Sequence, residues 1–412
     1  MKKLLLSFSL LIHVLTISAQ ADNRITFGTI DSLNSAILGE QRKIWIYVPE
    51  SGPAGLYAVQ RYPVVYLLDG DAHFFSVAGM IQQLSAVNGN MICPEMIVVA
   101  IPNTDRTRDL TPTHVEADPP FMDSAFSKTS GGGERFLAFI EKELMPHIDS
   151  LYPTQPYKML IGHSFGGLTV MNAFVNHNKL FNSYICIDPS MWWDHQKLLA
   201  ATKNKLAENK YTGTSLFLGI ANTMDDGMNI KSVRKDTAGS SKHIRSILSL
   251  RDYFEANKQN GLKFSSKYYS EDTHGSLPLI TEYDALRFIF DFYALKLGPA
   301  DFMDSTDRLA KKLENHFTNV SSKMGYTVTP PENQVNSFGY NALSEKQFKK
   351  AESFFKLNVA NFPKSANVYD SYGDYFLAIG DPGNAIIQFR KALSINENPD
   401  TKAKLEQLLN KK

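Results

Sequence analysis

The sequence predicts an α/β protein with a mostly parallel, buried sheet, followed by a small all-α repeat domain at the C-terminus. From residue 43 to residue 293, apolar runs of strand length alternate with longer segments whose apolar residues recur at helical spacing, as in βαβ units. Beyond residue 296 only helical spacing remains, and positions in it recur after 34 residues. The 43% of apolar residues suffice for a core, and a net charge of +1 gives no reason to expect nucleic acid as a partner.

The N-terminal residues have the pattern of a signal peptide. A basic start, Met1-Lys2-Lys3, precedes the apolar stretch 4–17 and the small residues of segment 18–21. The apolar stretch is too short for a membrane span, and no cysteine follows it for lipid attachment. We therefore expect residues 1–21 to be removed on export to the periplasm or the medium, and we expect no membrane span.

The chain contains two cysteines, Cys93 and Cys186, and both lie in or beside apolar runs. We expect them to be free and buried, although export would permit a disulfide. No spacing of cysteine and histidine residues indicates a metal site, so no metal is expected.

Seven runs of strand character predict the sheet. They cover residues 43–48, 63–68, 96–101, 157–161, 184–187, 215–220 and 263–269. Apolar residues at helical spacing predict helices over residues 133–149, 168–175 and 277–293. Ligands bind at the carboxyl ends of the strands in such a sheet, so the residues that follow the strands are the candidates for function.

The C-terminal segment repeats. Residues 339 and 373 are both glycine, 351 and 385 both alanine, and 355 and 389 both phenylalanine, each pair 34 residues apart. This period is typical of tetratricopeptide repeats, although two unrelated amphipathic helix pairs remain the alternative. We expect an α/β domain over 22–296, a helical linker over 297–330 and repeats over 331–412. Two repeats are too few to stand alone, so they are expected to pack on the α/β domain, on helical residues 309–317, or on another chain as a homodimer or protein complex.

A candidate nucleophile follows the strand 157–161. Gly162-His163-Ser164-Phe165-Gly166 matches G-x-S-x-G, in which a serine occupies a strained turn between a strand and a helix. Apolar runs on both sides of the motif supply that strand and that helix. The context predicts the α/β-hydrolase fold, with Ser164 as the nucleophile.

A serine nucleophile needs a base, and His274 is the expected one. It follows the last predicted strand, in a turn before the helix 277–293. The remaining histidines precede Ser164, follow it too closely, or lie in helical stretches, as His243 and His316 do. In this fold the base comes last in chain order.

The orienting acid is expected after the strand 215–220, where Asp225 is the preferred candidate. Asp226, Asp236 and Asp272 remain alternatives.

The oxyanion hole needs backbone N–H donors. One is expected from Phe165, the residue after the nucleophile. The other is expected from the loop after the strand 63–68, at Gly70 or Asp71.

Several segments together resemble a known family, the esterases related to enterochelin esterase and esterase D. The resemblance covers roughly residues 25–295 and is carried by YLLDGDAHF (66–74), TRDLTP (107–112), GGG (131–133), GHSFGG (162–167), DPSMWW (188–193) and HGS (274–276). It implies catalytic roles for Ser164 and His274, ester substrates that include siderophore trilactones, and no cofactor. It is silent on the acid, because some such esterases work with a Ser–His pair. The family's usual Gly-x-x-Glu after the seventh strand is replaced here by Asn222-Thr223-Met224-Asp225.

Four residues are candidates for substrate binding. Arg106 and Arg108 follow the strand 96–101, where they would bind an anionic or catecholate group. An Arg108–Asp109 contact that stabilises the loop is the alternative. Trp192 and Trp193 offer aromatic walls for an acyl pocket, with core packing as the alternative for one of them.

The sequence therefore predicts a secreted serine carboxylic ester hydrolase that works through an acyl-enzyme. Siderophore esters and esters on polysaccharides are the candidate small-molecule substrates. Acyl transfer on the same fold is one alternative. A catalytically inert scaffold that recruits partners through its helical repeats is another.

Overall fold

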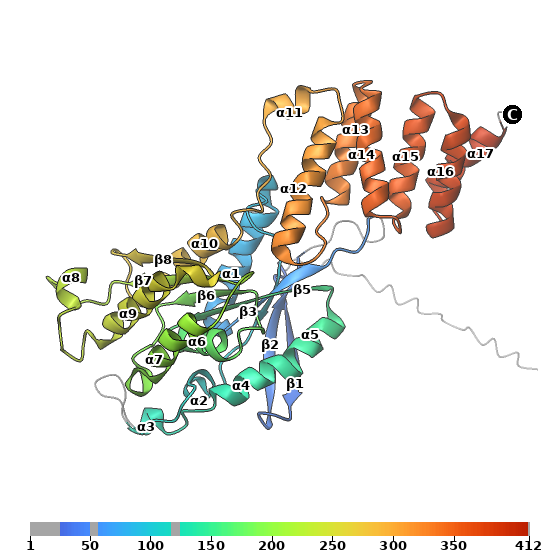
Figure 1. Cartoon of the computed structure of the whole chain (residues 1–412). Helices are drawn as coiled ribbons and strands as arrows, with labels where there is room; N and C mark the ends of the chain where they lie inside the picture. The colour runs from blue at the N-terminus through green and yellow to red at the C-terminus, as the bar shows by residue number, and fades with distance from the viewer. Residues whose placement is uncertain (1–24, 50–56, 117–123, 411–412) are drawn as a thin grey trace, which may run out of the picture.

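The computed structural model describes residues 25–49, 57–116 and 124–410 (Figure 1). The predicted signal peptide, residues 1–21, lies outside the described residues. Within the described residues, no helix has the length and apolar character needed to cross a membrane.

The core of the α/β domain is an eight-stranded sheet with the order β1-β2-β4-β3-β5-β6-β7-β8. β1 pairs antiparallel with β2, and β2 antiparallel with β4, whereas all further pairs are parallel. The strands are β1 (Thr29–Ser35), β2 (Glu40–Tyr47), β3 (Tyr62–Leu67), β4 (Ile97–Ala100), β5 (Thr154–His163), β6 (Ser183–Ile187), β7 (Ser215–Ala221) and β8 (Lys263–Tyr269). The mostly parallel sheet predicted from the sequence is confirmed.

Helices cover both faces of the sheet. Alternate residues of β3 show why: Val64 and Tyr66 pack into one apolar core, and Val65 and Leu67 into the other. The first core lies under α4 (Gly133–Phe139), η2 (Ile140–Leu144), α5 (Met145–Leu151), α6 (Phe165–Asn176), α7 (Trp193–Glu208) and α9 (Lys242–Ala256). The second lies under α1 (Gly70–Ser85), α10 (Leu277–Ile289) and part of α12 (Arg308–Met324). Shorter helices fill the connections: η1 (Val87–Gly89), α2 (Arg106–Leu110), α3 (Ser124–Ser127), α8 (Ile230–Val233), η3 (Lys258–Asn260) and α11 (Pro299–Met303).

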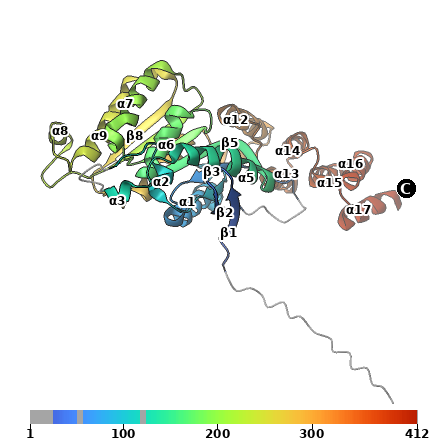
Figure 2. The ribbon, with the colours of Figure 1, turned by 90° about the horizontal axis from the view of Figure 1, so that it is seen from below.

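The C-terminal helices stand in a row beside α12, to one side of the sheet and away from α7, α8 and α9 (Figures 1 and 2). They are α13 (Glu332–Ser344), α14 (Phe348–Asn361), α15 (Ala366–Ala378), α16 (Pro382–Ile395) and α17 (Pro399–Asn410). The residues that recur after 34 positions form the same glycine–phenylalanine contact in two successive helix pairs. A Cβ on Gly339 would lie 2.7 Å from the Phe355 ring, and one on Gly373 would lie 2.5 Å from the Phe389 ring. Their assignment as tetratricopeptide repeats stays a prediction.

Helix α12 belongs to both parts of the molecule. Near its C-terminal end, Val320 and Met324 are buried in the core beneath α1 and α10. Nearer its start, Leu313 and Phe317 pack with Phe354 of α14 in a separate core. The C-terminal helices thus pack on the helical stretch 309–317, one of the three packing surfaces expected from the sequence.

Candidate active site

The backbone at Ser164 is strained. Ser164 connects β5 to α6 with φ +60° and ψ −113°, a conformation that costs free energy for any residue except glycine. The neighbouring glycines allow strand and helix to approach. A Cβ on Gly162 would lie 2.4 Å from the carbonyl oxygen of Gly166, and one on Gly167 would lie 2.9 Å from Pro189 Cα. This is the geometry of a nucleophile turn.

His274 lies at the same edge of the sheet, in the loop between β8 and α10. Its Nδ1 is 2.7 Å from Oδ2 of Asp188, the residue that directly follows β6. Asp188 is fully buried and accepts two further hydrogen bonds: Ala221 N–H donates to Oδ1 at 2.9 Å, and His243 Nε2 lies 2.8 Å from Oδ2. The carboxylate that orients His274 is therefore Asp188.

Burial alone would raise the pKa of Asp188 because it disfavours the charged form. Hydrogen bonds from His243 and His274 outweigh that effect and hold the pKa well below its usual value. Asp188 is accordingly an anion, as the acid of a triad must be to stabilise an imidazolium.

The expected contact between Asp225 and His274 is not present in the described part of the chain. Asp225 is exposed and accepts a hydrogen bond from Ser240 Oγ at 2.9 Å. The structure gives no contact with His274 for the three alternative acids within the described residues either. Asp236 accepts a hydrogen bond from Ser241 Oγ, Asp272 accepts one from Ser276 Oγ, and Asp226 is exposed.

The prediction assumed that the acid follows β7, whereas the carboxylate that contacts His274 follows β6, one strand earlier. Two signals in the sequence pointed to Asp188: its position directly after an apolar run, and the DPSMWW segment. No sequence signal separated His243 from an ordinary helical residue.

One of the expected oxyanion donors is occupied. Gly70 N–H donates to the carbonyl of Ile101 at 3.0 Å, so it does not face the site. Glycine is required there for another reason, since a Cβ would lie 2.6 Å from Ile101 N. The remaining expected donors are Phe165, which begins α6 directly after Ser164, and Asp71 in the first turn of α1.

Arg106 connects three loops at the edge of the site. It forms a two-pronged ion pair with Asp69, with Nε 2.6 Å from Oδ1 and Nη2 3.0 Å from Oδ2. Nη2 also donates to the carbonyl of His163 at 3.3 Å, and the guanidinium lies 5.4 Å from the centre of the Phe165 ring. About a third of the side chain, 34%, is exposed. Arg106 is thus on the rim, as expected, but its contacts hold the loops around Ser164.

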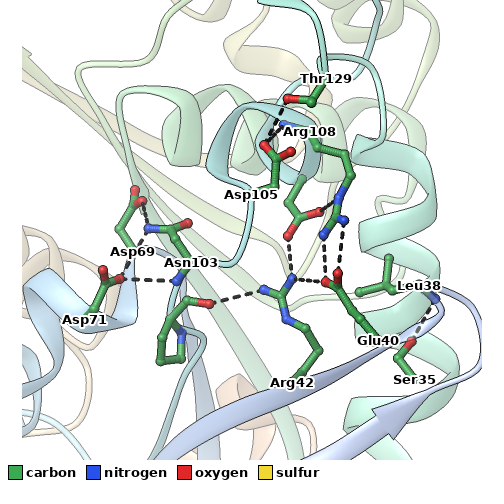
Figure 3. Close-up of polar contacts among 12 residues, drawn as sticks. Ser35, Leu38, Glu40, Arg42, Asp69, Asp71, Asn103, Asp105, Arg108 and Thr129 are labelled. Atoms are coloured by element: carbon green, nitrogen blue, oxygen red, sulfur yellow. Dashed lines mark hydrogen bonds and ion pairs between the residues drawn. The ribbon is translucent and has the colours of Figure 1, made fainter. Parts of the chain in front are cut away.

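Arg108 makes the Asp109 contact that the loop-stabilising alternative predicts. It pairs with both oxygens of Glu40 at 2.7 and 3.0 Å and with Asp109 at 2.7 Å, and the buried Arg42 pairs with the same two acids (Figure 3). These contacts bind α2 to β2. They match the loop-stabilising alternative, and substrate binding by Arg108 stays a prediction.

The two tryptophans are both buried. Trp193 is 2% exposed, and its Nε1 donates to the carbonyl of Thr113 at 3.1 Å, so it belongs to the core. Trp192 is 5% exposed and lies 6.1 Å from the Phe165 ring, measured between ring centroids. Of the two, Trp192 stays the candidate wall of an acyl pocket, because Phe165 directly follows the nucleophile.

A row of imidazoles crosses the site. The ring centroids of His163 and His274 are 4.4 Å apart, and those of His163 and His73 are 6.0 Å apart. Burial and the neighbouring His274 lower the pKa of His163 to about 4, so its ring is neutral near pH 7. His163 thus packs against the base without adding charge. On the nucleophile side, Ser164 Oγ lies 3.4 Å from Ser190 Oγ.

Asp188, His243 and His274 place their ligand atoms within 4.8 Å of one another, a spacing that would also admit a metal ion. The two hydrogen bonds to Asp188 account for this spacing without one. A separate cavity of about 560 Å³ borders Tyr62 and Gln155, at the amino ends of β3 and β5. It therefore lies at the opposite edge of the sheet from Ser164.

The sheet and the turn at Ser164 define the class of protein. α/β-hydrolases carry their nucleophile between a parallel strand and a helix, with the acid and histidine on later loops of the same edge. This chain has that order in Ser164, Asp188 and His274. It belongs to the esterase family, a family of carboxylic ester hydrolases: the family model described as "Putative esterase" matches residues 35–244, half of the chain.

Similar proteins whose names state an activity are also esterases. The chain is 27% identical over 164 residues to a siderophore enterobactin esterase of Emericella nidulans, covering 37% of this chain and 52% of that protein. It is 32% identical over 162 residues to the ferri-bacillibactin esterase BesA of Bacillus subtilis, covering 36% and 55%. The chain thus spans about half the length of these curated relatives. An IroE-like serine hydrolase from Shewanella oneidensis matches in structure with a TM-score of 0.67 and 31% identity, covering 81% of this chain and 99% of that one.

Proposed function

We propose that the protein is an exported enzyme that hydrolyses carboxylic esters through an acyl-enzyme on Ser164, with His274 as the base and Asp188 as the orienting acid. The observation that carries this proposal is the 2.7 Å contact between His274 Nδ1 and Asp188 Oδ2. It assigns the proton of a neutral imidazole to Nδ1, which leaves Nε2 to accept the proton of a serine hydroxyl.

The reaction then has two halves. His274 Nε2 takes the Ser164 proton while Oγ attacks the ester carbonyl, and the C–O bond to the alcohol breaks as His274 returns the proton to it. Water next attacks the acyl-enzyme, again losing its proton to His274, and the acid leaves as Ser164 is restored. The N–H groups of Phe165 and Asp71 are the proposed donors to the oxyanion.

A siderophore ester is the proposed substrate. One relative is named as a siderophore enterobactin esterase and another as a ferri-bacillibactin esterase, and these names support the choice. Cationic groups lie near Ser164 beside two buried aromatic rings: the partly exposed Arg106 lies against Phe165, and Lys242 Nζ lies 5.8 Å from the Trp192 ring. Such groups suit aromatic or anionic substituents on the ester.

The test uses the purified full chain with p-nitrophenyl acetate and with a trilactone siderophore, the second followed by mass spectrometry. We expect hydrolysis of both, a higher kcat/KM for the trilactone, and a loss of about a million-fold in turnover for Ser164→Ala. A folded Ser164→Ala protein with normal turnover would rule out the acyl-enzyme.

The same assay addresses the alternatives. Ester product formed on an added sugar or glycerol, in place of free acid, would indicate acyl transfer. Export is tested by N-terminal sequencing of the mature protein from fractionated cells, where a start after residue 21 is expected.

A further inference from the structure

Asp188 Oδ2 accepts hydrogen bonds from two histidines. His274 Nδ1 lies 2.7 Å away, and His243 Nε2, on the first turn of α9, lies 2.8 Å away. We propose that His243 is a positioning residue for the ester reaction, which acts on His274 through Asp188. This inference rests on the proposed function, because it assigns a role within the same reaction.

His243 completes the set of hydrogen bonds that a buried carboxylate needs. Asp188 is fully buried, and in the described part of the chain its ion-pair partners are histidines only. Ala221 N–H satisfies Oδ1 at 2.9 Å, and the two histidines satisfy Oδ2. A buried anion that loses a donor pays a desolvation cost, and its side chain regains freedom to rotate.

The two histidines differ in how firmly they are held. His243 is 8% exposed, and α9 is anchored beneath it by Ile244 and Ile247, which are both buried in the sheet core. The side chain of His274 is 41% exposed and lies on a loop. We infer that the buried histidine fixes the orientation of the carboxylate, and that the carboxylate fixes the orientation of the more exposed one.

The variants His243→Leu and His243→Gln separate this role from packing. Leucine fills the space without a donor, whereas the Gln Nε2 group can donate from nearly the same place as the histidine Nε2. We expect His243→Leu to lower kcat about 10- to 100-fold with KM nearly unchanged, because a small misplacement of the base slows chemistry and not binding. His243→Gln should recover most of the turnover.

A matched control is the pair His147–Asp31, in which His147 Nε2 lies 2.7 Å from Asp31 Oδ2 outside the site. His147→Leu should leave kcat unchanged. If His243→Leu behaves like His147→Leu, with full turnover in a folded protein, the inference is overturned.

A double-mutant cycle tests whether His243 acts through Asp188. His243→Leu should cost little further turnover in an Asp188→Asn background, since the partner it orients is already lost. Independent, multiplying losses would show that His243 acts by another route and would overturn the proposal.

Proton NMR of the full chain with ¹⁵N-labelled histidine separates this inference from the proposed function. We expect two imidazole N–H protons hydrogen-bonded to Asp188, one lost in His243→Leu and both displaced in Asp188→Ala. Their presence in a wild-type protein that cleaves no ester would establish the contact but would end the proposed function, and with it the role of His243 in that reaction. Normal turnover without a His243 signal would overturn the inference alone.

Discussion

The backbone of Asp188 is strained, and this conformation directs its side chain into the site. Its φ is +41°, a value uncommon for a residue other than glycine, and Pro189 restricts it further. Its N–H still bonds to the Gly219 carbonyl at 2.9 Å, so the backbone follows the sheet while the carboxylate turns across the end of β7 to Ala221. Strain of this kind persists where surrounding contacts over-determine it, and here those contacts come from β7, α9 and the His274 loop.

Replacement of the acid distinguishes the two candidates directly. Asp188→Asn should lower kcat on a small ester by about a hundred- to ten-thousandfold, because an amide no longer selects the tautomer of His274 or stabilises its cation. Asp225→Asn is the matched control and should be nearly silent, since Asp225 is exposed and its side chain bonds only Ser240 among the described contacts. The assay is kcat and KM on p-nitrophenyl acetate. The reverse result would restore Asp225 as the acid.

Glu282, on α10, is a buried acid outside the reaction. It is 1% exposed, both of its oxygens lack a hydrogen-bond partner within the described residues, and burial raises its pKa to about 8 from an ordinary 4.5. The folded state thus holds this proton more tightly than the unfolded state. Stability attributable to this proton is therefore full below pH 4.5 and falls as pH rises to about 8.

Glu282→Gln removes this dependence, because the amide has nearly the same shape and no charge. We expect the melting temperature of the variant to exceed that of the wild type clearly at pH 9 and little at pH 5. Thermal melts by circular dichroism at both values provide the measurement, with the exposed Glu397→Gln as the control. Equal differences at the two pH values would show that the Glu282 carboxyl is solvated or paired.

At the scale of elements, the site is assembled by loops that follow β3, β4, β5, β6 and β8, and Arg106 ties three of them together. Asp69 precedes α1, Arg106 begins α2, and the His163 carbonyl ends β5. The nucleophile turn and the proposed oxyanion loop are thereby held at one spacing. Their relative position thus depends on Arg106, the side chain for which the sequence predicts substrate binding.

Arg106→Gln should lower kcat for a neutral ester about tenfold, because a slight displacement of the Phe165 and Asp71 donors weakens their hold on the oxyanion. Arg108→Gln is the control: it should lower the melting temperature without changing kcat, because its partners, Glu40 and Asp109, tie α2 to β2. If Arg106→Gln instead raises KM only for anionic esters, the original substrate-binding role is correct.

The elements also show what sequence could reveal. The buried strands were found because a parallel sheet covered on both faces demands continuous apolar runs, as in the segment Val64-Val65-Tyr66-Leu67. The sequence did not predict β1, because its residues are polar and mostly exposed. β1 is the edge strand of the sheet, and its partner β2 runs antiparallel to it. Ser164 and His274 could be expected from local patterns. The contact between Asp188 and His274, in contrast, joins two residues that are 86 positions apart in the sequence. No local pattern encodes a contact of that range.

At the scale of the whole molecule, the junction between the sheet domain and the tail is built like a core and not like a flexible linker. Glu332, 3% exposed at the start of α13, accepts hydrogen bonds from Ala58 N–H at 2.9 Å and from Ser365 Oγ at 2.7 Å. Lys350 Nζ donates to the Phe302 carbonyl at 2.6 Å. One acid thus joins the sheet domain to two repeats, and α12 contributes to the apolar cores on both sides.

Truncation measures how much each core depends on α12. A chain that ends at residue 325 keeps Val320 and Met324 in the sheet-domain core but exposes the Leu313 and Phe317 face that the repeats cover. A chain that ends at residue 296 loses α12 as well and uncovers the α1 and α10 face. We expect the melting temperature to fall in the order full chain, 325, 296, with kcat on small esters retained at 325, since Ser164, Asp188 and His274 all precede the cut.

The point variant Phe354→Ala tests the same contact without shortening the chain. Phe354 lies on α14 and is fully buried against α12, so its removal should cost about 3–5 kcal/mol of tail stability while the chemistry at Ser164 persists. Light scattering on each species reports whether the uncovered face associates with a second copy. An unchanged melting temperature and mass in both the 325 chain and Phe354→Ala would mean that the repeats do not stabilise the sheet domain. Their apolar contacts would then serve only to hold a separate binding module in place.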